Sequence, residues 1–446
     1  MTENLYDEPY RPQFHFTPRV NWTNDPNGLV YYKGEYHLFF QHNPVGINWG
    51  NMTWGHAVSP DLLHWRQLPN ALEPDALGTM FSGSAVVDWH NTTGLKQGDS
   101  DTLVAIYTAA GNTSPESHGQ PFTQCIATSH DRGRSWTKYA GNPVLRNIVK
   151  ENRDPKVVWH APTERWIMAL YLDANSYALF SSPDLIHWTH LQDIEMPECT
   201  ECPDFFELPV AHSPDETRWV FTAANGRYLI GSFDGTRYIP ESQPLQVDFG
   251  ANYYAVQTYS DTPDGRRIQL AWMAGGQYPD MPFNQQMSFP CELTLRRTPD
   301  GLRLYRYPIA ELAALRAREQ TWHDVELTPH ANALAGIEGE LLEIELDLAL
   351  EEGDFILNVR GNPITYDGAT GTLSCMGKSA GVAPENGQLE LLVLVDRASI
   401  ELFVNGGRIS MTSCFLPTPE DRSLSLTSSG VYAHSIHIRE LKSIWR

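Results

Sequence analysis

The seven residues from Ser59 to Trp65, "SPDLLHW", recur in altered form along the first half of the chain, and this repeat decides the fold. Related stretches are "SHDRGRSW" (129–136), "SPDLIHW" (182–188) and "SFDGTRY" (232–238), each running from Ser-x-Asp to an aromatic residue. The aromatic residues lie 71, 52 and 50 residues apart. Repeated β units of this size are typical of propeller blades, each a small sheet that cannot bury its face alone. Because Ser and Asp close turns and the aromatic residue fills space between blades, we expect the repeats to be structural.

The rest of the chain extends this β pattern. Residues 20–300 contain short alternating or aromatic-rich runs separated by turns rich in Pro, Gly, Asp and Asn. At roughly 50–60 residues per blade, this length predicts about five blades. From about residue 321, longer alternating runs such as "LELLVLVDRASIELFVNGG" predict an antiparallel β-sandwich. Between the two, "IAELAALRARE" (309–319) has the spacing of an amphipathic helix.

We therefore predict an all-β chain with two domains. A five-bladed β-propeller is expected over residues 1–305, a linker helix over 306–320 and a C-terminal β-sandwich over 321–446. A length of 446 residues favours two cores over one.

Charge and hydropathy exclude several partners. The chain has 32 basic and 54 acidic residues, a net charge of −22, whereas nucleic acids and anionic membranes require basic patches. No apolar run approaches the ~20 residues of a membrane-spanning helix. The N-terminal "MTENLYDEPYRPQF" has no basic region followed by an apolar one, so we expect a cytoplasmic protein, or a secreted one if a leader was removed.

The six cysteines do not form a recognisable metal or redox motif. Only Cys199 and Cys202, in "CTEC", are close in sequence, and a zinc ribbon requires a second such pair. A thioredoxin-like motif requires a βαβ context, which the surroundings lack. We expect free thiols and no metal.

Three acidic residues, each near a proline, are candidates for chemistry. Asp25 lies in "WTNDPNG", where Pro26 and Gly28 predict a sharp turn, and Asp154 lies in "NRDPKVVW". Glu201 lies in "CTECPDFFELP", between thiols and ahead of two phenylalanines, the apolar setting that suits a general acid. Each could also be an ordinary turn or solvated residue. A propeller, however, can bring acids from three blades to one end of its axis, and two such carboxyl groups make up the catalytic pair of a glycosidase.

Sugars present apolar C–H faces and many hydroxyl groups, so aromatic, amide and hydroxyl side chains are expected around such a pair. The candidates are Trp49, Trp54, Phe81, Tyr254, Gln41 and Ser82.

The ordered motifs "NWTNDPNG", "FFQHNP", "NWGNMTWGHAVSPDLLHW", "FSGSAV", "RDPKV", "ECPD" and "DFGANYYAVQT" resemble those of glycoside hydrolase family 32, the invertases, levanases and inulinases. The likeness spans roughly residues 12–295, and "DRASIELFVNGG" resembles the family's C-terminal sandwich. It implies a five-bladed propeller with a sandwich, acting on fructose-containing oligo- or polysaccharides without metal or organic cofactor.

The resemblance also implies residue roles. Asp25 would be the nucleophile and Glu201 the acid/base of a retaining enzyme that releases terminal β-D-fructofuranosyl units. Asp154, with Arg153 beside it, would hold fructose hydroxyls and stabilise the transition state. The fructose pocket would be lined by Asn24, Gln41, Trp49, Phe81, Ser82 and Tyr254.

Two positions depart from the family pattern. Thr23 stands where Met is usual, a minor change beside the nucleophile. Gly276 stands where many levanase-like members have a second Trp four residues after Trp272. Its absence predicts a wider entrance, unless the following "PDMPFNQQ" loop refills the space.

Three functions fit the pattern. The leading one is an exo-acting hydrolase of sucrose, inulin or levan. A fructosyltransferase or an endo-acting, oligosaccharide-forming fructanase on the same scaffold is the second. A non-catalytic fructan-binding propeller is the third, although a binder has no need of all three acids. The sequence does not indicate an oligomeric state.

Overall fold

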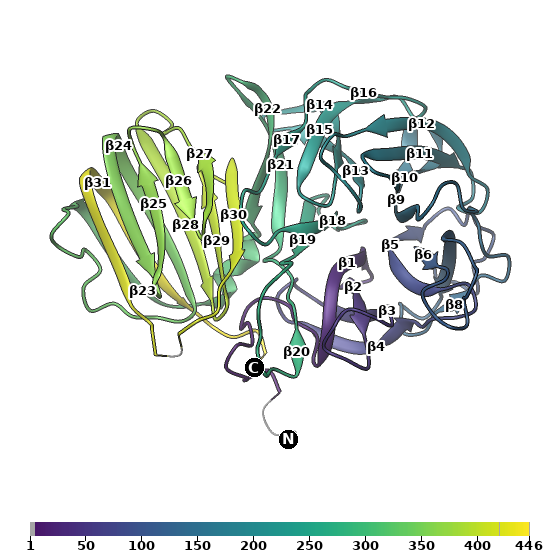
Figure 1. Ribbon diagram of the computed structural model, residues 1–446. Helices are drawn as coiled ribbons and strands as arrows, with labels where there is room; N and C mark the ends of the chain where they lie inside the picture. The colour runs from purple at the N-terminus through teal and green to yellow at the C-terminus, as the bar shows by residue number, and fades with distance from the viewer. Residues whose placement is uncertain (1–4, 419, 446) are drawn as a thin grey trace.

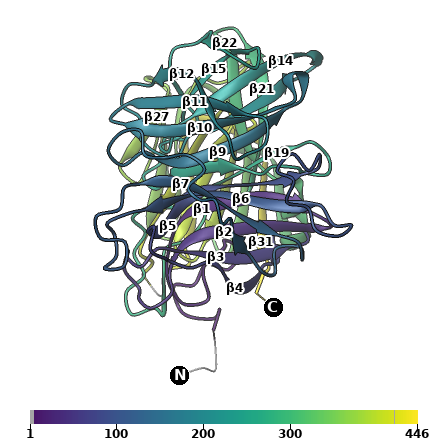
Figure 2. The same ribbon diagram turned by 90° about the vertical axis from the view of Figure 1, so that its right-hand side faces the viewer.

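A computed structural model describes residues 5–418 and 420–445, and nearly all of its regular structure is β-strand. Strands β1–β22 form sheets arranged around a common axis, and strands β23–β31 form a layered unit beside them (Figure 1). In the view turned by 90°, the layered unit lies behind the propeller (Figure 2). Among the described residues, no helix has the length and apolar character needed to cross a bilayer.

The first two sheets lie within residues 21–138, apart from one short later strand. In the five-stranded sheet the order is β20-β1-β2-β3-β4, with β20 parallel to β1 and the other pairs antiparallel. The four-stranded sheet has the order β5-β6-β7-β8. The strands are β1 (Asn21–Tyr32), β2 (Glu35–Asn43), β3 (Thr53–Ser59), β4 (Arg66–Leu72), β20 (Phe283–Asn284), β5 (Thr79–Asp88), β6 (Thr102–Ala110), β7 (Thr123–Ser129) and β8 (Thr137–Lys138).

The next sheets continue around the axis. A four-stranded sheet has the order β12-β11-β10-β9, and a nine-stranded sheet follows it. The nine-stranded sheet consists of two antiparallel groups joined by a single parallel pair, Val210 with Leu295. This division is compatible with five blades, and the number of blades stays a prediction. The strands are β9 (Arg153–His160), β10 (Arg165–Asp173), β11 (Ser176–Ser182), β12 (Thr189–Glu195), β13 (Asp204–Val210), β14 (Ser213–Thr222), β15 (Arg227–Phe233), β16 (Tyr238–Pro240), β17 (Leu245–Gln246), β18 (Tyr254–Thr258), β19 (Arg267–Trp272), β21 (Cys291–Thr298) and β22 (Gly301–Pro308); a short 3-10 helix, η1 (Ala161–Thr163), joins β9 to β10.

The Ser-x-Asp repeats have the structural role expected of them. Ser59 donates to Asp61 at 3.0 Å, and the same carboxylate accepts the backbone N–H of Leu63 at 3.0 Å. Ser182 and Asp184 repeat this turn. The aromatic residues that end the repeats pack against different apolar clusters of the propeller, as expected for side chains that fill space between blades: Trp65, Trp136, Trp188 and Tyr238.

The C-terminal unit is a sandwich built on two long strands. β24 pairs with β31 along its length, and on its other edge it pairs first with β28 and then with β25. Alternate apolar side chains such as Ile344, Leu346 and Leu348 meet between the layers and are fully buried. The strands are β23 (Arg316–Glu326), β24 (Leu342–Val359), β25 (Asn362–Asp367), β26 (Thr372–Cys375), β27 (Lys378–Gly381), β28 (Gln388–Asp396), β29 (Ser399–Val404), β30 (Ile409–Cys414) and β31 (Leu424–Leu441).

The linker helix expected over residues 306–320 is wrong in type and length. Only η2 (Ala310–Leu315) is helical, as a 3-10 helix that buries Leu312 and Leu315. Residues 316–326 form β23, which pairs antiparallel with β31. The Ala- and Arg-rich sequence favours a helix locally, but the free edge of β31 provides a ladder of backbone hydrogen bonds, and tertiary pairing overrides a weak propensity.

Propeller and sandwich are joined by a buried ionic network as well as by apolar contacts. His15 contacts Asp396 through Nδ1 at 2.8 Å and Glu401 through Nε2 at 2.7 Å. Arg306, at the end of β22, reaches Glu401 at 3.1 Å and Asp248 at 3.3 Å. All these side chains are almost completely buried, so the network fixes the sandwich against the propeller.

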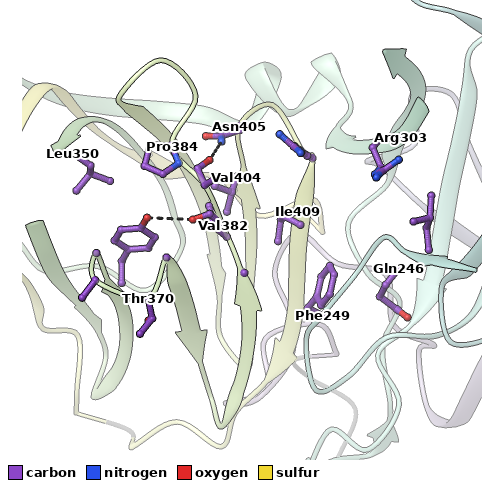
Figure 3. A pocket seen from close by; sticks show the side chains of 18 of the residues that line it. Gln246, Phe249, Arg303, Leu350, Thr370, Val382, Pro384, Val404, Asn405 and Ile409 are labelled. Atoms are coloured by element: carbon purple, nitrogen blue, oxygen red, sulfur yellow. Dashed lines mark hydrogen bonds between the residues drawn. The ribbon is translucent and has the colours of Figure 1, made fainter. Parts of the chain in front are cut away.

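Beside this junction lies a cleft of about 690 Å³ between the two units. Figure 3 shows Phe249 and Ile409 between Gln246 and Arg303 on the propeller side and Thr370 and Pro384 on the sandwich side. Among the described residues, its lining includes two arginines but no carboxylate. The cleft therefore lacks the paired acids that the sequence singles out.

Candidate active site

A cavity of about 660 Å³ lies where the inner strands of the propeller begin. Asp25 lies near the start of β1, Ser82 near the start of β5, Asp154 near the start of β9 and Tyr254 at the start of β18. Glu201 precedes β13. The propeller thus brings together the three acids that the sequence separates by up to 176 residues. Its lining is Asn24, Asp25, Gln41, Trp49, Phe81, Ser82, Gly111, Asn112, Thr113, Gln120, Pro121, Phe122, Lys150, Glu151, Arg153, Asp154, Glu201, Tyr254 and Trp272.

Asp25 sits on an irregular strand and not in the sharp turn expected from "NDPNG". β1 continues through these residues, and its register against β2 shifts between Thr23 and Pro26 and again between Asn27 and Val30. Such bulges turn a side chain out of the regular alternation and tolerate a proline. Gly28 has a φ of +53°, and a Cβ there would lie 2.5 Å from the Phe39 ring. The segment therefore needs its glycine for both conformation and space.

The Asp25 carboxylate is held by neighbouring donors. Ser82 Oγ donates to Oδ2 at 2.6 Å, and Asn24 Nδ2 donates to Oδ1 at 3.0 Å. Trp22 Nε1 in turn donates to Asn24 Oδ1 at 2.8 Å, which fixes the amide. Burial raises the pKa of Asp25, the hydrogen bonds from Ser82 and Asn24 oppose that rise, and the Glu201 charge adds to it.

Asp154 lies deeper, beside the Cys202 backbone. The N–H of Cys202 donates to Asp154 Oδ2 at 3.0 Å, and the Cys202 thiol lies 3.5 Å from the same oxygen and 3.6 Å from Asp25 Oδ2. Burial raises the pKa of Asp154 to about 7; the Arg153 guanidinium opposes this, whereas the charges of Glu201 and Asp25 add to it. Asp154 is therefore a carboxyl group that can hold a proton near neutral pH.

Glu201 does not have the apolar setting expected from its flanking thiols and phenylalanines. Its Oε1 accepts from Arg153 Nη2 at 2.7 Å, its Oε2 accepts from the Tyr254 hydroxyl, and its side chain is 31% exposed. Phe205 and Phe206 instead point into the propeller cores. Arg153 faces further carboxylates, since its Nε lies 3.9 Å from Asp154 Oδ2 and its Nη1 lies 3.9 Å from Glu151 Oε2.

Strained backbone accompanies the acids. Asp154, Glu201 and Cys202 have φ values of 64°, 58° and 40°, and Ala255, next to Tyr254, has 53°. A left-handed conformation costs a non-glycine residue about 1 kcal/mol or more. No sequence signal marks this backbone conformation, and two of the four residues, Asp154 and Glu201, line the cavity.

Of the binding residues named from sequence, all but Trp54 line the cavity. Trp49, Phe81 and Phe122 form one wall, with Trp49 and Phe81 rings 6.0 Å apart and Phe81 and Phe122 rings 5.5 Å apart. Gln41 is anchored by donating to the Met80 carbonyl at 2.9 Å. Trp54 is fully buried in an apolar cluster below the wall, and its Nε1 donates to the Phe81 carbonyl at 2.9 Å. Its placement as a sugar contact is wrong: it supports Phe81 from behind.

Sequence reasoning missed one side of the cavity. Asn112, Gln120 and Phe122 come from the β6–β7 connection, and Lys150 and Glu151 precede β9. These loop positions carry no motif that separates them from ordinary polar loops. Cys202 could have been found, because it adjoins Glu201 in "ECPD".

The wider entrance that Gly276 predicted is not found. Gly276 is buried and does not line the cavity, and a Cβ there would lie 2.6 Å from the Tyr278 hydroxyl. The Tyr278 ring packs against Phe283, and its hydroxyl donates to Gln286 at 2.7 Å. Tyr278 thus occupies the space beside Gly276. Within this segment, Trp272 is the indole that reaches the cavity.

Three acids brought together from separate parts of a propeller, facing an aromatic wall and a single guanidinium, define a glycosidase-type site. Comparison with known proteins agrees with this class. The model of the glycosyl hydrolases family 32 N-terminal domain matches residues 15–308, and that of the family's C-terminal domain matches residues 311–443. The chain belongs to family 32 of the glycosyl hydrolases.

Individual relatives give the same result. A levanase of Bacillus subtilis is 39% identical, with 99% of this chain and 72% of the relative covered, and an extracellular exo-inulinase of Aspergillus ficuum is 30% identical, with 99% and 96% covered. Among solved structures, the exo-inulinase of Aspergillus awamori superposes with a TM-score of 0.89 at 28% identity over 99% of this chain and all of that one. A fructofuranosidase of Schwanniomyces occidentalis, complexed with fructosylnystose, also reaches 0.89, at 27% identity over 99% of each chain.

Proposed function

We propose that this glycosidase is a retaining β-fructofuranosidase that releases terminal β-D-fructofuranosyl units from sucrose, inulin or levan-type fructans. The observation that carries the proposal is the gathering of Asp25, Asp154 and Glu201 in one cavity, with Arg153 as the neighbouring cation. Relatives named levanase, exo-inulinase and invertase support the substrate class.

In the first step, Asp25 attacks the anomeric carbon of the fructosyl unit. The C–O bond to the leaving sugar breaks, Glu201 gives its proton to the departing oxygen, and a covalent fructosyl-enzyme forms. Ser82 and Asn24 hold the attacking carboxylate in one orientation, which lowers the entropy cost of reaching the transition state.

In the second step, Glu201 takes a proton from water, and the water oxygen attacks the same carbon. The bond to Asp25 breaks, and fructose leaves with its original configuration because two displacements have occurred. Glu201 is partly exposed beside Arg153, so water can reach the carboxylate that takes its proton in this step.

Asp154 and Arg153 bind the sugar that reacts. A carboxylate at this depth accepts hydrogen bonds from fructose hydroxyls, and such bonds strengthen as positive charge develops on the ring. Arg153 balances negative charge from Glu201 and Asp154 and keeps Glu201 pointed at the cavity.

The test is an analysis of products from sucrose, inulin and levan. The proposal expects fructose from all three, accumulating from the start with no intermediate oligosaccharides. Shorter fructan fragments would show internal cleavage instead, and products longer than the substrate would show transfer to sugar in place of water. Absence of any fructose release from a folded protein would refute the function.

A further inference from the structure

A second cavity, of about 200 Å³, lies at the opposite end of the inner strands from the catalytic carboxylates. β5 leads from Ser82 to Asp88, and the next two residues, Trp89 and His90, line this cavity. Trp159 lines it near the end of β9, and Asp261 does so beyond the end of β18. At about 3.3 Å per residue, the stretch from Ser82 to Asp88 spans roughly 20 Å. This distal cavity is therefore separate from the active site.

Indole rings form its walls. Trp89 is 51% exposed, an unusual state for so large an apolar side chain. The rings of Trp159 and Trp166 lie 4.9 Å apart at 63°, and His90 lies 5.1 Å from Trp159. An accessible indole face next to a recess is the surface on which the C–H face of a sugar ring packs.

Polar groups converge on the same space. Asp261 accepts from Trp89 Nε1 at 2.8 Å, which holds the exposed indole in place. Arg267 donates from Nη1 to the Tyr259 carbonyl at 3.0 Å, but its Nε is buried and has no hydrogen-bond partner among the described residues. Arg267 therefore brings to the lining a guanidinium whose hydrogen-bonding capacity the described residues do not fully use. Ser260 adds a further hydroxyl to the lining.

We propose that the distal cavity binds one sugar residue of a fructan chain, as a non-catalytic anchoring site. Its small volume suits a single ring and not an oligosaccharide, and its mixture of indole faces, a carboxylate and an unpartnered guanidinium N–H matches a neutral polyol. The inference rests on the proposed function, because a polymeric fructoside is the ligand that could occupy both ends of the propeller.

A second binding site on the same protein can assist the hydrolysis of polymers but not of small substrates. A fructan held at the distal cavity keeps its other chain ends close to the catalytic cavity, which raises their effective concentration. Sucrose has one fructosyl unit and gains nothing from an anchor. The distal cavity should therefore affect KM for long fructans and leave sucrose hydrolysis unchanged.

Binding can be counted in the full chain carrying Asp25→Asn, which prevents turnover. Titration with an inulin-type trisaccharide, followed by calorimetry, is expected to give two sites per chain, and the additional change Trp89→Ala is expected to leave one. Trp89→Phe keeps an aromatic face and should retain the second site with weaker affinity. Ile239→Ala, which shortens a 53% exposed apolar side chain elsewhere on the propeller, is the matched control and should retain both sites.

Kinetics with the active chain provide the second measurement. Trp89→Ala should lower kcat/KM on inulin or levan by roughly tenfold, through KM, with unchanged kcat/KM on sucrose. The anchoring site would be refuted if the Asp25→Asn chain bound the trisaccharide at a single site. It would also be refuted if folded Trp89→Ala kept the wild-type ratio of kcat/KM for polymer to kcat/KM for sucrose. Failure of the wild-type chain to hydrolyse any fructoside would instead refute the proposed function, and the titration would still decide whether the distal cavity binds sugar.

Discussion

Two groups of buried acids lie in this molecule, one in the catalytic cavity and one between the propeller and the sandwich. In the interdomain group, the two imidazole nitrogens of His15 contact Asp396 and Glu401, and Arg306 adds a second cation. Burial alone would raise the pKa of both acids, but hydrogen bonds and charge from His15 bring both below their ordinary values. Each acid there contacts at least one cationic side chain.

The catalytic group has the opposite balance. Arg153 is the cation next to Glu201 and Asp154, and Asp25 is held only by neutral donors. The pKa values of Asp25 and Asp154 are raised, the latter to about 7. Buried acids that contact cations can stabilise the fold. Buried acids with too few cations nearby destabilise the fold, but they can exchange protons or act as nucleophiles. The same residue type thus serves stability in one place and chemistry in the other.

The largest effect on turnover is expected from Asp25→Asn. The amide cannot form the fructosyl-enzyme, so kcat on sucrose should fall by on the order of 10⁴-fold or more. The melting temperature should stay the same or rise, because the change removes a buried charge that lacks a cation. Steady-state kinetics and calorimetry measure both, and near-normal activity would show that another group is the nucleophile.

Glu201→Gln should cost about 10²–10⁴-fold with sucrose, since protonation of the leaving oxygen is what is lost. A fructoside with a good leaving group, such as a nitrophenol, does not need that proton in the first step and should be partly spared. Comparing kcat/KM for the two substrates separates a general acid from a residue that only shapes the cavity, for which both substrates would suffer equally.

The pH profile of the same variant sharpens the assignment further. Wild-type kcat/KM should be bell-shaped: activity is lost as pH falls because Asp25 and Asp154 become protonated, and this limb should lie above the ordinary carboxyl value of 3.8 since the pKa values of both are raised. The Glu201 charge contributes to that rise. In Glu201→Gln the acidic limb should therefore move to lower pH. If the acidic limb stays at the same pH in Glu201→Gln, Asp25 is not the group that titrates in that limb.

Glu401→Gln tests the structural group and should have little effect on the chemistry. Removing one partner of a buried ionic network costs about 3–5 kcal/mol of stability because His15 and Arg306 lose a compensating charge. The kcat of the folded fraction should remain close to that of the wild type. Urea denaturation of Glu401→Gln and of Asp25→Asn measures the contrast, with loss of stability expected only for Glu401→Gln. If both variants, or neither, were destabilised, the distinction between the two groups of acids would be wrong.

The sequence predicted those features that depend on local patterns. The Ser-x-Asp turns follow from side chains that bond their own backbone, and Asp25, Asp154 and Glu201 were marked by motif position. Residues 316–326 could not be predicted as a strand, because the partner that pairs with them, β31, lies more than 100 residues away in the chain. Trp54 was misplaced for a related reason: Trp49 and Trp54 lie five residues apart, and the local sequence does not decide which ring faces the cavity and which the core.

The smallest effect on catalysis is expected from Gly276→Trp. If the entrance were widened, an added indole would improve hydrolysis of sucrose relative to that of long fructan. The space beside Gly276 is already occupied by Tyr278, however, whose hydroxyl would lie 2.6 Å from a new Cβ. The indole can enter only by displacing a buried ring that packs on Phe283 and donates to Gln286. We therefore expect a loss of stability of about 1–3 kcal/mol, typical of overpacking, with an unchanged ratio of kcat/KM for sucrose and fructan. Gly276→Trp combined with Tyr278→Gly makes the room that the indole requires and should recover part of the stability. If the single variant changes the sucrose-to-fructan ratio several-fold while staying as stable as the wild type, the segment after Trp272 sets specificity after all, and the wall of the catalytic cavity extends beyond the residues that line it here.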